Sequence, residues 1–412
     1  MKHMNLSCRW LPVVFAASVL FLGGCHSGGK KADAQPEIDY SRIRGFNYTP
    51  AGVSAPRHHV DSWVKYDEQT TAFDMDLAKG LDLNQARVFV NYAAYTELGD
   101  ELAERLRHFT RECHSRGIGV MPVVGNGPWV TDTTRRAEAR QWVEFLVDAL
   151  SDEPGLAMWD VMNEPDYGAR GSAERLALNF DNCKFLSELF HELDPDTPVT
   201  IGMAFVWGMK AMADYVDVLQ FHDYSYTRGA VRDTLRLAKE FAAQAGKPLI
   251  NGELGCIARA NPYDVVLEEY AGSDVGWYLW ELMIVREGWG KVHGVFYEDG
   301  TVRDPSIPAA IMGYFRNRGD ILPEVPDQEG LLTKTVNRLN ALLAQPAPAW
   351  DEALTQAEIA ANLMESGQLV AMNVPPTWEV AQLREGEPDI AALRALLRKF
   401  VGILTPYMLP AN

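Results

Sequence analysis

Two glutamates follow short apolar segments directly, at positions where a carboxyl group could act as an acid or a nucleophile. Glu164 stands in an Asn-Glu-Pro triplet, and Glu253 stands in the stretch Asn-Gly-Glu-Leu-Gly. At the rim of a largely apolar cavity, burial disfavours the charged form of a carboxyl group and raises its pKa. One such glutamate is usually a member of an ion pair, whereas two that face each other can share acid–base and nucleophilic work.

The elements that must position these residues form a regular alternation between residues 42 and 320. Eight β-rich segments are each followed by a segment with helical spacing, such as 102–116, 136–150 and 231–245. This order predicts a parallel α/β fold, and its length is near the roughly 250 residues of a (β/α)8 TIM barrel. A doubly wound open sheet would carry a Gly-rich phosphate loop after its first strand, which 45–50 lacks. The predicted strands are 43–48, 86–91, 118–124, 156–162, 198–203, 216–221, 247–252 and 275–280.

In such barrels, reactive groups gather at the C-terminal ends of the strands. Glu164 would end the fourth strand and Glu253 the seventh, on opposite sides of the mouth. Most enzymes that hydrolyse glycosidic bonds use two carboxyl groups that face each other across the bond.

With these motifs in order, residues 40–315 resemble the clan A glycoside hydrolases, most closely the cellulase and mannanase type of family 5. The resemblance implies that Glu164 is the acid/base and Glu253 the nucleophile. It also implies retention of configuration, with a carboxyl separation of about 5 to 5.5 Å. Supporting roles fall to Arg87, which would keep the nucleophile ionised, to Asn163 at the sugar 2-hydroxyl, to His222 and Tyr224 of a His-x-Tyr motif, and to Trp280 as the floor of the sugar subsite.

The third strand departs from the family pattern, because the usual histidine is replaced by the stretch Val-Gly-Asn-Gly-Pro-Trp. Asn126 and Trp129 of this stretch are expected in the cleft, and His58 and His59 are candidates for the missing contact. Trp277 is expected in the core. Further candidates for sugar contacts are Tyr92, Asp166, Trp207, Asp223, Glu281 and His293.

Composition narrows the possible partners. The 412 residues are 47% hydrophobic and 23% charged, with a formal net charge of −18, so a nucleic-acid partner is excluded and a neutral glycan is favoured over a polyanionic one. No metal or cofactor is expected. Two alternatives stay open: a transglycosylase that uses the same residues, and an inactive glycan-binding surface lipoprotein. Oligomeric state is left open.

The N-terminal segment has the pattern of an export signal. Basic residues precede an apolar run that ends in Leu-Gly-Gly-Cys, which predicts a lipoprotein signal over 1–24 and lipidation of Cys25. A tether over 25–41 would then connect the barrel, 42–320, to a membrane of the bacterial cell envelope, the outer membrane being expected. Cys113, Cys183 and Cys256 are too few for a disulfide framework and are expected as buried thiols. Residues 321–412 predict a helical extension, with helices at 329–343, 350–365 and 389–404.

Overall fold

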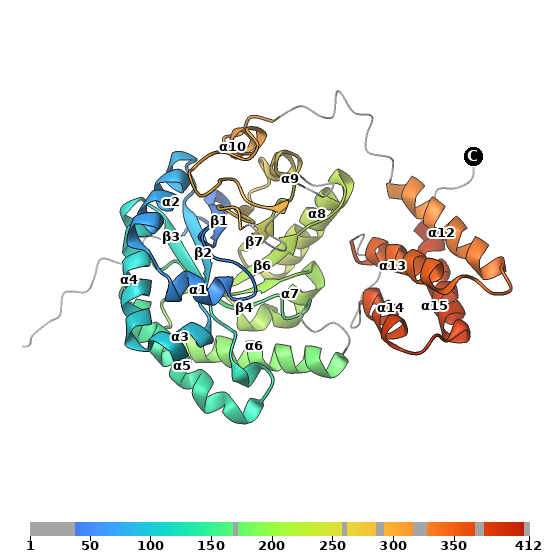
Figure 1. The fold of residues 1–412 in the computed structure, drawn as a ribbon, viewed down its shortest axis with the longest axis horizontal. Coiled ribbons are helices and arrows are strands. Elements are labelled where there is room, and N and C mark those ends of the chain that lie inside the picture. The colour runs from blue at the N-terminus through green and yellow to red at the C-terminus, as the bar shows by residue number, and fades with distance from the viewer. Residues whose placement is uncertain are drawn as a thin grey trace, which may run out of the picture. The chain divides into compact units, whose positions relative to one another are not determined.

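Eight parallel strands close into a barrel. The computed structural model describes residues 38–167, 172–257, 262–285, 292–315, 328–366 and 375–407. Its strands pair in sequence order and β1 pairs with β8, so the predicted (β/α)8 TIM barrel is confirmed (Figure 1). The strands are β1 (Arg44–Tyr48), β2 (Gln85–Phe89), β3 (Gly119–Val123), β4 (Trp159–Asn163), β5 (Val199–Met203), β6 (Val218–Asp223), β7 (Leu249–Leu254) and β8 (Gly276–Leu279).

Helices surround these strands, as the ribbon from α1 in blue to α10 in orange shows in Figure 1. The amphipathic pattern that predicted α4 is confirmed, because Leu102, Leu106, Phe109 and Cys113 form one buried face. The helices of the barrel are α1 (His58–Val64), α2 (Glu68–Gly80), α3 (Tyr92–Leu98), α4 (Asp100–Ser115), α5 (Arg136–Leu150), α6 (Ala173–Leu193), α7 (Val206–Met212), α8 (Arg228–Ala245), α9 (Tyr263–Tyr270) and α10 (Ser306–Ile311). Short 3-10 helices lie at Tyr40–Arg42, Pro128–Val130, Thr133–Arg135 and Ala213–Tyr215.

The strand ends differ from the prediction where the site lies. Strands β6 and β7 each continue two residues beyond the predicted ends, to Asp223 and Leu254. The polar residues at these ends, which read as the start of loops, are therefore held by sheet hydrogen bonding. Their side chains are thereby fixed more firmly than a loop would hold them.

The C-terminal helices have a hydrophobic core of their own. They are α12 (Gln328–Ala344), α13 (Trp350–Ser366), α14 (Pro376–Glu385) and α15 (Ile390–Leu404), followed by a 3-10 turn at Thr405–Tyr407. Three match the predicted segments, whereas α14 was missed. It begins at the second proline of the pair Pro375-Pro376, and proline is common at the first position of a helix. The core of this unit includes Val336, Leu339, Ala357, Ala361, Leu393, Leu397 and Phe400.

Cys113, Cys183 and Cys256 are free, buried thiols, as expected. Within the described part of the chain, no helix is both long and apolar enough to span a membrane. The predicted signal, its Cys25 and most of the tether lie outside the described residues.

The tight closure of the barrel predicts the effect of a single methyl group. A Cβ added at Gly45 of β1 would lie 2.3 Å from the ring of the buried Tyr278, whose hydroxyl is held by Gln85 at 2.8 Å. We expect Gly45→Ala to lower the free energy of unfolding by about 1–3 kcal/mol through overpacking. Urea unfolding measures this, with Gly80→Ala as control, because a Cβ at Gly80 meets no atom within 4 Å. Equal stability of the two variants would contradict the proposed packing.

Candidate active site

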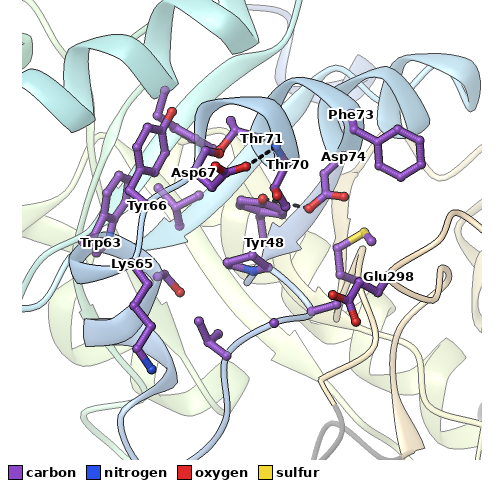
Figure 2. Close-up of a pocket in the computed structure, with 18 of the residues that line it drawn as sticks. Tyr48, Trp63, Lys65, Tyr66, Asp67, Thr70, Thr71, Phe73, Asp74 and Glu298 are labelled. Atoms are coloured by element: carbon purple, nitrogen blue, oxygen red, sulfur yellow. Dashed lines mark hydrogen bonds between the residues drawn. The ribbon is translucent and has the colours of Figure 1, made fainter.

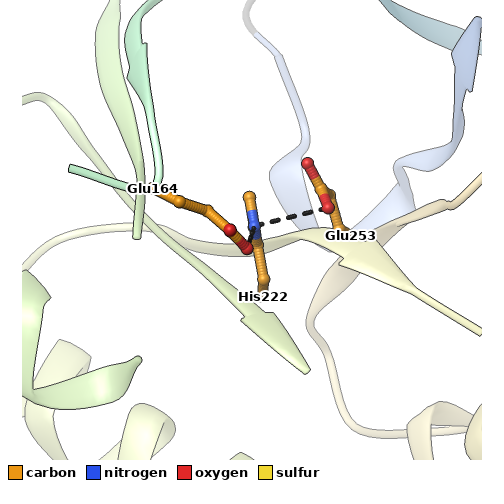
Figure 3. A group of neighbouring side chains, drawn as sticks. All are labelled: Glu164, His222 and Glu253. Atoms are coloured by element: carbon orange, nitrogen blue, oxygen red, sulfur yellow. Dashed lines mark hydrogen bonds and ion pairs between the residues drawn. The ribbon is translucent and has the colours of Figure 1, made fainter. Parts of the chain in front are cut away.

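Glu164, His222 and Glu253 meet at the C-terminal mouth of the barrel. Figure 3 shows the two glutamate side chains approaching the imidazole from different strands. Nδ1 of His222 lies 2.8 Å from Oε1 of Glu164 and 3.6 Å from Oε2 of Glu253. One atom of each side chain can be chosen so that all three lie within 4.8 Å of one another. The two glutamates singled out from the sequence are therefore neighbours.

Irregular strand pairing aims these residues at the mouth. The register shifts between Asp160 and Asn163 on β4, and between Phe221 and His222 on β6. Glu164 has a positive φ of 44°, rare outside glycine, and its amide donates to the Gly202 carbonyl at 2.6 Å. Local irregularities of this kind redirect side chains and occur often beside active sites.

The buried guanidinium of Arg87 connects the two sides of the site. Nη1 donates to Oε1 of Glu253 at 2.7 Å and to Asn47 at 2.8 Å. Nε donates to Asp160 at 2.9 Å, and Nη2 donates to Oδ1 of Asn163 at 2.7 Å. Arg87 has no exposed surface, so its orientation is set by these partners.

The partners of Arg87 are themselves anchored. Asp160 also accepts from the Gly202 amide at 3.1 Å and from Gln220 at 3.0 Å, and Asn47 donates to the carbonyls of Gly252 and Leu279. The sequence motifs did not indicate Asp160 or Gln220, nor the contact of Asn47 with Arg87. The available signal was a polar residue inside an otherwise apolar strand, because such a residue is buried only with partners.

Burial and charge act in opposite directions on Glu253. Burial raises the pKa of this carboxyl, and the charge of Glu164 adds to the rise. His222, Arg87 and the Tyr224 hydroxyl, which donates to Oε2 at 3.0 Å, oppose it. The expected contacts of Arg87 and Tyr224 are confirmed, yet the net direction is upward, because complete burial outweighs them. The ionised form of Glu253 therefore depends on the arginine.

His222 is neutral at physiological pH, since burial lowers its pKa to about 4. A neutral ring carries one proton, so the short Nδ1–Glu164 hydrogen bond has two forms. In one, Nδ1–H donates to an ionised Glu164, and in the other a protonated Glu164 donates to the bare Nδ1. The Glu164–His222 pair can thus hold a proton at the mouth of the barrel.

Other acidic residues near the mouth support the site. Burial, with the charge of Glu253, raises the pKa of Glu281 to about 8, so Glu281 is neutral at pH 7. Asp166 is fully buried, which raises its pKa to about 7, and it accepts from the amides of Ala204 and Phe205 at 2.8 and 3.1 Å. Asp166 therefore fixes the turn after Glu164. Asp223, likewise buried, accepts from the Ser225 amide at 2.9 Å.

The aromatic predictions divide between cleft and core. Trp280 is half-buried, and its ring lies edge-on to the Phe89 ring, with 5.8 Å between the ring centres. The Phe89 ring in turn lies against the Arg87 guanidinium. Trp129, by contrast, is fully buried against Tyr92, so the prediction that it stacks on a sugar is wrong for this conformation. The short 3-10 helix that contains Trp129 turns its ring into the core. Trp277 is buried, as expected.

The remaining predicted residues are accounted for as follows. Asn126 accepts from the Tyr92 amide at 2.9 Å and so shapes the loop after β3. His59, the candidate substitute for the missing histidine, stacks on Phe89 at 4.1 Å, and burial lowers its pKa to about 3. His58 starts α1, Trp207 stacks on Phe205, and His293 is buried beside Tyr224.

The same cluster also offers the ligand types of a metal site. Glu164, His222 and Glu253 could each supply one ligand atom. However, the Arg87 guanidinium already places a positive charge 2.7 Å from Glu253, where a metal cation would be repelled. Two carboxyl groups in different surroundings, with Arg87 on Glu253 and His222 on Glu164, suit acid–nucleophile chemistry better.

Comparisons with known proteins support the fold. No model of a known protein family matches the chain, and no curated protein matches it. Among solved structures, an exo-β-1,4-mannosidase from Opitutaceae bacterium strain TAV5 is similar, with 18% identity and a TM-score of 0.52 over 66% of this chain. This chain spans only 58% of that protein.

Two further structures are similar. One is a GH5_18 protein from Streptomyces cattleya in complex with GlcNAc, with 16% identity and a TM-score of 0.53 over 69% of this chain and 82% of that one. The other is an endo-1,4-β-mannanase from Rhizomucor miehei, with 14% identity and a TM-score of 0.50 over 68% and 95%. At these identities the likeness establishes the shared barrel fold alone.

Removal of the charge of Arg87 should destabilise the fold. Arg87→Met leaves Asp160 and Glu253 buried without their cation, so we expect the free energy of unfolding at pH 7 to fall by about 3–5 kcal/mol. The deficit should shrink in acid, where protonation removes the uncompensated charges. Urea unfolding measures both effects. Arg140→Met, which removes an exposed ion pair to Glu192, is the control and should change stability little.

The buried imidazole gives a pH-dependent prediction. We expect His222 to remain neutral from pH 8 to pH 5, because burial lowers its pKa from 6.5 to about 4. The unfolded chain therefore binds this proton first as the pH falls below 6.5, so His222 destabilises the folded state between pH 6.5 and about 4. Nitrogen-15 NMR titration, with His222→Gln to assign the signal, measures the midpoint. A midpoint near 6.5 would contradict the burial described.

Proposed function

We propose that this protein is a retaining β-glycoside hydrolase, with Glu253 as nucleophile and Glu164 as acid/base. The observation that carries the proposal is the pairing of these two carboxyl groups at the barrel mouth, with the Arg87 guanidinium on Glu253 and the His222 imidazole on Glu164. The single arginine favours the charged form of Glu253, whereas Glu164 shares a proton with a neutral histidine. These different environments suit two different chemical roles.

The spacing supports the retaining form of the reaction. An oxygen of Glu164 lies within 4.8 Å of an oxygen of Glu253, whereas inverting enzymes keep their carboxyl groups about 6.5–9.5 Å apart to admit a water molecule. Glu253 would attack the anomeric carbon while Glu164 gives its proton to the leaving oxygen. Once the glycosyl-enzyme forms, the charge of Glu253 is gone, and Glu164 can take a proton from water.

The arrangement of Asn163 supports a role at the sugar 2-hydroxyl. Its Oδ1 accepts from Arg87, which leaves the Nδ2 amide free to donate to a hydroxyl group. Hydrogen bonds to the 2-hydroxyl strengthen toward the transition state of this reaction. A neutral glycan fits the net charge of −18. We also propose, from the sequence alone, that Cys25 carries a lipid anchor in the cell envelope.

Covalent trapping tests the proposal. We expect incubation with 2-fluoro β-glycosides that carry a good leaving group to add one glycosyl group to Glu253, detected by peptide mass spectrometry. Glu164→Ala should slow hydrolysis of aryl glycosides with poor leaving groups by about 10²–10⁴-fold. For aryl glycosides with good leaving groups, the first step, formation of the glycosyl-enzyme, should keep nearly its normal rate. Glu188→Ala, which removes an exposed glutamate of α6, is the control.

Several results would overturn the proposal. If Glu164→Ala slows the substrates of both leaving-group classes equally, Glu164 is not the acid. An inverted product, measured by proton NMR, would exclude the covalent route. No adduct and no hydrolysis across gluco-, manno-, xylo- and galacto-configured substrates would instead favour a protein that only binds glycans.

A further inference from the structure

A cavity of about 450 Å³ lies outside the barrel mouth, on the helix side of β1 and β2. Side chains alternate along a strand, and Asn47 and Arg87 point into the barrel toward Glu253. Their neighbours Tyr48 and Val88 therefore point outward, and both line the cavity. Tyr48 stacks on Phe109 of α4 at 5.7 Å, which confirms its direction. The cavity is thus separate from the catalytic pair.

The cavity has a buried floor and an exposed rim. Its floor includes Trp63, Asp74 and Phe109, all at most 3% exposed. Its rim includes Gln69, Thr70 and other exposed polar side chains, so it opens to solvent. Figure 2 shows aromatic rings, hydroxyl groups and carboxyl groups around the same space. Apolar walls with a few polar groups are typical of small-ligand sites, and the volume lies in their usual range of about 300–1,000 Å³.

Asp74 is the polar group at the floor. It lies in the middle of α2, is 1% exposed, and accepts from the Tyr48 hydroxyl at 2.9 Å through Oδ2. Tyr48 does not occupy Oδ1, which leaves this oxygen for a ligand. Burial, together with the charge of Glu298 at the rim, raises the pKa of Asp74 to about 7, so its carboxyl group can accept or donate a hydrogen bond at neutral pH. Lys65, the basic rim residue, is instead paired with Asp61 at 2.8 Å.

We propose that this cavity binds a neutral glycosyl unit. Aromatic walls suit the apolar face of a pyranose ring, and Asp74, Gln69 and Thr70 offer partners for its hydroxyl groups. An anionic ligand is disfavoured, because the rim and floor carry carboxyl groups and Lys65 is already paired.

The position of the cavity indicates which glycan supplies the unit. Phe89 and His59 line the cavity, and the Phe89 ring also lies against the Arg87 guanidinium, 5.1 Å from its centre, and edge-on to Trp280. The Phe89 ring therefore contacts both the cavity and the residues of the mouth. The bound unit is a distal or branching residue of the glycan whose bond the mouth cleaves, and this assignment rests on the proposed function.

Two variants can disable the cavity with little risk to folding. Gly52 lies at its rim, and a Cβ there meets no atom within 4 Å, so Gly52→Trp should block the opening. Gly80→Trp is the matched control, at an equally open position that does not line the cavity. Asp74→Asn changes the floor, and Asp76→Asn, two residues along α2 and exposed in an ion pair with Arg116, is its control.

Hydrolysis kinetics provide the first test. With tetrasaccharides such as β-1,4-mannotetraose or cellotetraose, we expect Gly52→Trp to raise KM about tenfold or more, and Asp74→Asn to raise it less. Neither variant should change kcat/KM for an aryl monoglycoside, which does not reach the cavity. Both control variants should behave as the wild type. Unchanged KM for every tetrasaccharide cleaved would overturn the assignment to the substrate glycan.

Calorimetric titration provides a test that needs no catalysis. The full-length protein carries Glu164→Gln in every sample, so that the same two tetrasaccharides are not cleaved. In that background the otherwise unchanged protein and Gly80→Trp should bind at least tenfold more tightly than Gly52→Trp. If Gly52→Trp weakens tetrasaccharide binding but the wild type hydrolyses no substrate, the proposed function is refuted and the glycan site in the cavity is retained. Equal weakening with mannose or glucose alone, without any effect on KM, would assign the cavity to a separate sugar. Equal affinity of all variants, or no binding to the otherwise unchanged protein, would overturn the site.

Discussion

The architecture of the mouth depends on one buried cation, the guanidinium of Arg87. An unpaired guanidinium without exposed surface would be very costly, so the surrounding strands must supply acceptors at fixed positions. They do so from β1, β4 and β7, through Asn47, Asp160 and Glu253, with Asn163 at the end of β4. The same hydrogen bonds that hold the arginine therefore hold Glu253 directly and fix Asn163, the residue before Glu164.

The charge balance at the mouth limits how many carboxyl groups can ionise. Glu253 and Asp160 contact Arg87 directly, whereas burial, together with the charge of Glu253, raises the pKa of Glu281 to about 8. Like charges that share a low-dielectric site cannot all form together. One arginine thus distinguishes carboxyl groups that look alike in sequence. Glu164 remains outside this set and is coupled to a neutral imidazole.

Strand alternation places two different surfaces on the same pair of strands. On β1 and β2, one set of side chains enters the barrel beside Glu253, and the next residues face the helices and line the cavity above Asp74. Phe89, at the end of β2, contacts both sides. Mutations at this ring would therefore affect both regions, whereas the buried Trp129 belongs to neither, despite its place after a strand.

The sequence by itself determined the barrel, its strand order and the strand-end places of Glu164 and Glu253, because periodicity and strand ends are local signals. Arg87 and Tyr224 were identified through the resemblance to a family, and both contact Glu253. It did not determine the direction of Trp129, the start of α14, or the bonding of Asp160, Asn47 and Gln220. Those depend on where shifted register, burial and neighbouring strands place each side chain. The net pKa direction of Glu253 likewise came only from the tertiary structure, since burial competes there with His222, Arg87 and Tyr224.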